Sequence, residues 1–167
     1  MSVLKPISNN SIPKALIRAK HYRLLNEPWQ AESICRDILT VDQDNQTAIR
    51  YLVLAITDQF GVSKGASETE AKRFCTKLSS EYEQKYYRGI IEERLGKIAL
   101  VRTTPRAKYI AYEHYHSAMK FFEDAEKIRP EKNEDSILRW NACVRRIKEY
   151  RLVPSVEDRG VQPFLDT

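Results

Sequence analysis

The sequence predicts an all-α fold in which antiparallel helical hairpins, with about seven helices in all, stack into a short α–α superhelix. Through most of the 167 residues, apolar side chains recur at spacings of three and four, as in helices with one buried face. Only 7 prolines and 5 glycines interrupt this pattern. A triplet of small or apolar residues also recurs at intervals of about forty residues, as in helical repeats. It occurs at Ala31, Cys35 and Ile38, at Ala71, Cys75 and Leu78, and at Ala118, Phe122 and Ala125.

The first two helices follow a polar segment over 1–11 that is predicted to be irregular. Ser11 is the expected N-cap of a helix over 12–25, because its hydroxyl can accept a hydrogen bond from a backbone N–H of the first turn. Asn26 is a stop signal for this helix. The second helix begins directly afterwards and carries Trp29 together with the first triplet.

The next three helices are separated by polar loops. A helix is expected over 46–59, followed by a loop with two glycines. Ser67 and Ser80 each precede a glutamate by three residues, which is the spacing of a capping box. They predict one helix over 68–79 and a longer one that runs to about residue 101.

Two further helices complete the predicted domain, which spans 12–150. Thr104 as the cap and Pro105 in the first turn are the expected start of the sixth helix. Asn133 or Asp135 is the expected cap of the seventh helix. The domain therefore consists of three hairpins and one additional helix.

These hairpins resemble tetratricopeptide repeats. Ala19 and Ala31 match the small residues that let paired helices approach closely, 118–130 matches a second repeat helix, and 94–100 resembles the Leu-Gly pair of a first helix. The resemblance covers about 12–130, with the seventh helix as a cap. It implies three degenerate repeats and a concave groove, lined by the first helix of each hairpin, that binds a peptide or helix of a partner protein. It also implies that the protein is a scaffold or adaptor without catalytic chemistry.

The resemblance identifies candidate partner-binding residues at first-helix positions outside the apolar seam. Cationic and apolar groups alternate along such a groove, which suits an acidic and hydrophobic peptide. The alternative is that the cations form an ordinary solvated face. The candidates are Lys20 and Arg23 in the first helix, Thr47, Arg50, Leu54 and Thr57 in the third, and Tyr86 and Ile90 in the fifth.

A second candidate surface is the basic stretch 94–108, at the predicted tip of the longest hairpin, which contains no acidic residue. The chain as a whole is only mildly basic, with a net charge of +5. A local cluster of cations can bind the phosphates of nucleic acid, so a nucleic-acid-associated protein is the alternative function. The simpler alternative is a solvated tip that keeps the protein soluble. The cations of this basic tip are Arg94, Lys97, Arg102, Arg106 and Lys108.

No pattern in the sequence predicts an enzyme, a cofactor or a metal site. His114 and His116 are two residues apart on a predicted helix, so their side chains point about 200° apart and cannot readily share a metal. The 3 cysteines lack the CxxC spacing. Cys35 and Cys75 match Phe122 in the triplets, which predicts small buried side chains without a redox role.

The tail over 151–167 has turn residues and is expected to be extended, but it also carries apolar side chains such as Phe164. It is predicted to pack on its own helices or on a second copy, which makes a homo-oligomer or a structural subunit a further alternative. The chain has no apolar run long enough for a membrane span, and its first residues lack the apolar stretch of a signal peptide. A cytoplasmic protein without membrane contact is expected.

Overall fold

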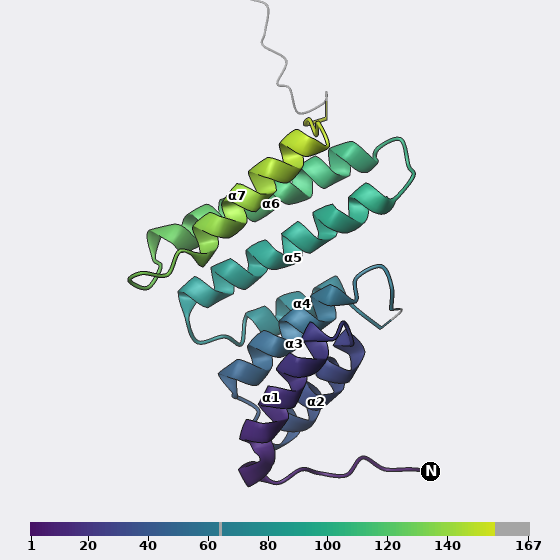
Figure 1. Ribbon diagram of the computed structural model, residues 1–167, viewed down its shortest axis with the longest axis vertical. Helices are drawn as coiled ribbons and strands as arrows, with labels where there is room; N and C mark the ends of the chain where they lie inside the picture. The colour runs from purple at the N-terminus through teal and green to yellow at the C-terminus, as the bar shows by residue number, and fades with distance from the viewer. Residues whose placement is uncertain (64, 156–167) are drawn as a thin grey trace, which may run out of the picture.

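The computed structural model describes residues 1–63 and 65–155, and over these ranges it is all-helical without a strand (Figure 1). The predicted all-α class with seven helices is confirmed for this part of the chain. None of the helices described there is long and apolar enough to cross a bilayer. After a single 3-10 turn, Asn9–Ser11, the helices are α1 (Ile12–Leu24), α2 (Pro28–Val41), α3 (Gln46–Asp58), α4 (Glu68–Cys75), α5 (Glu81–Val101), α6 (Ala107–Lys127) and α7 (Asp135–Glu149).

Each helix packs against the next one along the chain, and the contact between α5 and α6 is the most extensive. The odd-numbered helices also contact each other, α1 against α3 and α3 against α5. In Figure 1, α1, α3, α5 and α7 run in about the same direction, so their C-terminal ends lie along one edge of the molecule. This edge contains the α1–α2, α3–α4 and α5–α6 connections.

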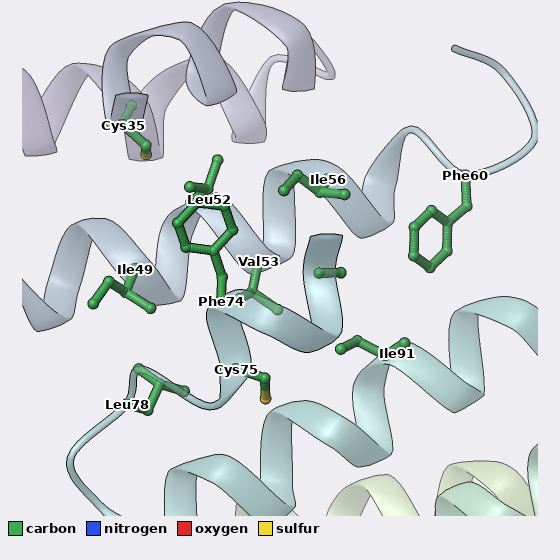
Figure 2. Close-up of a cluster of buried hydrophobic side chains, with 12 residues drawn as sticks. Cys35, Ile49, Leu52, Val53, Ile56, Phe60, Phe74, Cys75, Leu78 and Ile91 are labelled. Carbon is green, nitrogen blue, oxygen red and sulfur yellow. The ribbon is translucent and has the colours of Figure 1, made fainter. Parts of the chain in front are cut away.

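The core of the N-terminal half is built around α3 (Figure 2). Its Leu52, Val53 and Ile56 are fully buried, because successive apolar residues on α3 face α2 on one side and α4 and α5 on the other. Phe74 of α4 and Ile91 of α5 close this cluster. A helix buried on several sides explains why α3 is the most apolar segment of the chain.

The recurring triplet is buried in all three hairpins. None of its nine residues is more than 1 % exposed. Within it, Cys35 and Cys75 are free thiols, and burial raises the pKa of each to about 12. Both are therefore neutral at physiological pH and pack as small apolar side chains, as the triplet predicts.

The α5–α6 pair packs closely because α5 has glycine where a side chain would collide with α6. A Cβ on Gly89 would lie 2.5 Å from Cε1 of Phe122, and one on Gly96 would lie 3.0 Å from Cδ2 of Tyr115. Since both distances are shorter than ordinary carbon–carbon contacts, neither glycine can be replaced without movement of a ring. Phe122, the bulky member of the third triplet, thus packs into the space that a side chain at Gly89 would occupy.

Two of the predicted caps are confirmed. The Ser67 hydroxyl accepts a hydrogen bond from the backbone N–H of Glu70 at 3.3 Å, and Ser80 does the same for Glu83 at 3.2 Å. However, α4 ends at Cys75, four residues earlier than predicted. Single turns after this point bring the side chain of Leu78 into the core.

The predicted starts of α1 and α6 are partly wrong. The Ser11 hydroxyl does not cap α1, because it donates a hydrogen bond to the carbonyl of Ser8 at 2.7 Å. Helix α6 begins at Ala107, after Pro105, because the chain first forms a turn in which the Ala107 N–H donates to the Thr104 carbonyl. For α7 the predicted region is correct, but the predicted cap is wrong, because the N-cap is Glu134 without a side-chain hydrogen bond. The Asn133 side chain accepts from the backbone N–H of Asp135, one residue farther on.

The predicted tail is described only to Ser155. Over this part, Leu152 is 5 % exposed and packs with α5, α6 and α7. The prediction that the tail packs on its own helices therefore applies to Leu152. The prediction of docking on a second copy concerns 156–167, which lie outside the described residues.

Candidate partner-binding surface

Two residues that the sequence assigns to different surfaces meet at one carboxylate. Arg23 of α1 donates from Nε to Oδ2 of Asp58 at 2.7 Å, and Nη2 of Arg94 on α5 lies 3.3 Å from Oδ1 of the same residue. Arg23 is a groove candidate, whereas Arg94 belongs to the basic tip. Asp58 is the last residue of α3 and Arg23 lies in the last turn of α1, so this contact links the C-terminal ends of α1 and α3 to the C-terminal half of α5.

A second set of ion pairs lies in the middle of the face formed by the odd-numbered helices. Arg50 of α3 donates to Oε1 of Glu83 on α5 at 2.7 Å and to the hydroxyl of Thr47 at 2.8 Å. Farther along, Nη1 of Arg139 on α7 lies 3.2 Å from both carboxylate oxygens of Glu93 on α5. Each of these two arginines therefore has a carboxylate of its own on another helix.

Most of the remaining groove candidates belong to the core. Ile90 is buried between α5 and α6, and Leu54 packs against the same cluster. Thr57 is buried, its hydroxyl donates to the Leu54 carbonyl at 2.9 Å, and it also lines the central hollow described below. The Tyr86 ring packs against Phe122 with a centroid distance of 5.9 Å. Lys20 is exposed on α1 and lines none of the hollows described below.

Beside the shared carboxylate, the surface is hollowed. This central hollow has a volume of about 390 Å³ and lies between the ends of α1, α3 and α5. Three cations line it, Arg23, Arg94 and Lys97, together with apolar side chains. Two of the apolar side chains are unusually exposed, Val62 at 89 % and Val101 at 77 %.

The structure divides the basic tip into two groups. Arg94 and Lys97 line the central hollow, and Lys97 makes no ion pair with any described residue. Arg102, Arg106 and Lys108 are exposed around the α5–α6 connection, also without an ion pair inside the described ranges. The first group is thus part of a recess, and the second is a solvated end of the hairpin.

A hollow lies on each side of the central one. The tryptophan hollow has a volume of about 510 Å³ and shares Asn26 and Val62 with the central hollow. Its Trp29 is 66 % exposed, so this ring does not belong to the buried face of α2. The tyrosine hollow, of about 180 Å³, shares Lys97 and Val101 with the central one. It adds Arg146 and Tyr150, and the three hollows together are called the edge surface.

Sequence reasoning misses most of the edge surface, although one signal was present. Trp29 lies two residues before Ala31, so on a helix it points about 200° away from the buried triplet. Asn26 has a positive φ of 60°, which is consistent with its predicted role as a stop. No local pattern identifies Asp58 or Val62, because their importance depends on side chains from other helices.

The histidine pair has a structural role on the opposite side of α5. Nδ1 of His114 lies 2.8 Å from Oε2 of Glu92, and Nζ of Lys72 lies 3.4 Å from Oε1. Burial raises the pKa of Glu92, but the His114 hydrogen bond and the Lys72 charge outweigh it and lower the pKa below the ordinary value. His116 instead stacks on Tyr112, with 5.7 Å between ring centroids. The contact joins α4, α5 and α6 through one carboxylate.

Comparisons with known proteins give no relative that assigns a role to these residues. No family model matches the chain, and no curated protein or solved structure is significantly similar to it.

Proposed function

We propose that this protein is a non-catalytic, tetratricopeptide-like scaffold that binds a segment of a partner protein. The observation that carries the proposal is the central hollow, in which exposed Val62 and Val101 lie beside Arg23, Arg94 and Lys97. Apolar side chains that remain exposed next to a recess are a common feature of protein-binding sites. The buried, repeating triplet supports the tetratricopeptide-like part of the proposal, since it provides the same packing position in each hairpin.

Rigid helical packing suits this function. The odd-numbered helices are joined by ion pairs across their faces, and the α5–α6 pair is closely packed at its glycines. A surface held in this way loses little conformational entropy when a partner binds, so more of the contact energy appears as affinity. The scaffold thus positions the hollow, and the partner segment orders on it.

The test is affinity capture from a lysate of the source cells, with nuclease added and the tagged full-length chain as bait. Quantitative mass spectrometry compares wild type with Val101→Ser and with the control Lys120→Glu, which changes an exposed α6 cation outside every hollow described here. We expect a discrete protein to be retained by wild type and the control but lost with Val101→Ser. Equal capture by all three proteins, or no captured protein, contradicts the proposal.

A second candidate is a nucleic-acid-associated function at the outer group of the basic tip. The observation in its favour is that Arg102, Arg106 and Lys108 are exposed and make no ion pair within the described residues. Binding through such cations depends on phosphate contacts and falls steeply with salt. Fluorescence anisotropy with a labelled RNA and a labelled DNA of mixed sequence tests it. A triple substitution of these cations by glutamine should abolish binding, whereas Lys97→Gln should change it little.

A further inference from the structure

We infer that the edge surface binds an extended acidic segment whose carboxylates face the central hollow and whose apolar side chains occupy the two flanking hollows. This inference rests on the proposed function and specifies the chemistry of its partner. The inferred binding surface is the edge at the C-terminal helix ends, whereas the sequence predicts a groove in the middle of the face formed by the odd-numbered helices. Four observations support it. They are the continuity of the hollows, the charge at their centre, the aromatic rings at their ends and the ion pairs that each cation in the middle of the face makes with its own carboxylate.

The hollows form one continuous path. The tryptophan hollow and the central hollow share Asn26 and Val62, and the central and tyrosine hollows share Lys97 and Val101. A single small anion would occupy only the centre of such a path. A peptide chain can place successive side chains in all three hollows, since alternate residues of an extended chain point the same way.

The centre of the path carries an excess of positive charge. Arg23 and Arg94 share the single carboxylate of Asp58, and Lys97 has no partner among the described residues. The partners of these cations must therefore include water or an incoming acid. A carboxylate can accept from Lys97 and from guanidinium N–H groups that the shared Asp58 does not use.

Each end of the path carries an exposed aromatic ring beside a charged side chain, Glu27 in the tryptophan hollow and Arg146 in the tyrosine hollow. Trp29 is 66 % exposed at one end, and Tyr150 is 39 % exposed at the other. Tryptophan, tyrosine and arginine are the residues that most often dominate the binding energy of protein interfaces. Apolar side chains of the partner can therefore be desolvated at both ends while its acidic groups remain at the centre.

The cations alone have another explanation, which does not extend to the apolar groups. Cations in the last turn of a helix are stabilised by the helix dipole, and Arg146 lies in the last turn of α7, whereas α5 has no cation in its last turn. The dipole gives no reason for Trp29, Val62 and Val101 to stay exposed beside these cations. In the middle of the face formed by the odd-numbered helices, Arg50 and Arg139 each have their own carboxylate, whereas Arg23 and Arg94 share Asp58.

The experiment selects ligands without assuming their sequence. A phage-displayed library of random peptides is panned on the immobilised full-length protein at moderate salt, and enriched peptides are synthesised with a fluorescent label. We expect the enriched peptides to combine Asp or Glu with Leu, Phe or other apolar residues. Anisotropy titrations then compare wild type with Lys97→Glu, which reverses the central charge, and with Trp29→Ser, which removes an apolar end.

Two matched controls separate the edge surface from the rest of the molecule. Lys120→Glu reverses an exposed cation on α6, and Leu138→Ser removes an apolar side chain of α7 that is 62 % exposed. Neither residue lines one of the three hollows. Each edge substitution should weaken binding by about tenfold or more, and each control should change it by less than about twofold.

The outcomes distinguish this inference from the proposed function. Enriched peptides without acidic residues, whose binding is lost with Trp29→Ser but kept with Lys97→Glu, overturn the acidic chemistry and leave a protein-binding surface. Peptides that bind all variants equally, or a library that yields no binder, overturn both. Binding that increases with Lys97→Glu indicates a basic partner and also overturns the inference.

Discussion

Along α5, two neighbouring stretches of one helix have opposite surroundings. Gly89 and Gly96 face aromatic rings of α6 at distances that leave no space for a methyl group. One residue and five residues beyond Gly96, Lys97 and Val101 face two hollows and remain largely exposed. In the first stretch any added atom must displace a neighbour. At Lys97 and Val101, in contrast, altered atoms meet solvent, so these two positions are free to vary without disturbing the core.

The comparison shows how one long helix can join a rigid core to the edge surface, where we propose that a partner binds. The glycines fix the position of α5 relative to α6, and the ion pairs of Asp58 and Glu93 fix it relative to α3 and α7. The end of α5 is then held in place by contacts made farther back along the helix. A side chain at Lys97 or Val101 can therefore be replaced without moving the surface that carries it.

The largest expected effect tests the buried stretch. Phe122→Ala should lower the free energy of unfolding by about 3–5 kcal/mol, because this fully buried ring fills the space beside Gly89 and Tyr86. Urea unfolding followed by far-UV circular dichroism measures the change. The control is Phe121→Ala, which removes a half-buried ring from the same helix. Equal losses for the two variants contradict the close packing of α5 on α6.

An intermediate effect concerns the Glu92 contact on the opposite side of α5. Because its folded-state pKa is lowered, this carboxylate stabilises the fold above its unfolded pKa, and the contribution is lost as pH falls through the folded pKa. Glu92→Gln should cost about 1–3 kcal/mol at neutral pH. The difference from wild type should shrink below a pH of about 4. Urea unfolding across this pH range measures it, and a constant difference contradicts the ionised contact with His114 and Lys72.

The smallest effect is expected at the edge surface. Lys97→Glu should change the free energy of unfolding by less than about 1 kcal/mol, because the side chain is exposed and makes no ion pair with a described residue. Val101→Ser should change it by about 0.5 kcal/mol or less. The same urea titrations measure both variants. A loss as large as that of Phe122→Ala means that the edge supports the fold, and the contrast between the two stretches of α5 is then wrong.

Local sequence patterns predict much of the fold. The triplet spacing identifies residues that are all buried, and the serines at 67 and 80 cap the helices that they precede. The sequence patterns predict wrong helix boundaries where a local signal competes with a tertiary contact. Helix α4 ends before its predicted limit because Leu78 is drawn into the core, and a turn at Thr104 delays the start of α6. Such contacts affect where a helix begins or ends more than they affect whether a helix forms in that region.

The candidate site is less accessible to sequence reasoning. Arg23 and Arg50 match groove positions and are charged, but nothing local reveals that each has an acidic partner on another helix. Likewise, Lys97 and Arg102 appear in the same basic stretch, although only Lys97 lines the central hollow. Whether a cation is free or paired depends on residues far away in the chain.

The sequence by itself determined the helical class, the repeating buried face and the absence of a recognisable catalytic motif, because these depend on residue types and spacings along one chain. Only the tertiary structure decided which charges are paired, how closely α5 approaches α6 and where the hollows lie. Pairing and shape arise when side chains from different helices meet. In this protein, Asp58 at the end of α3 brings Arg23 and Arg94 together beside Lys97, which has no ion-pair partner in the described part of the chain, and so determines the edge that we propose as the binding surface.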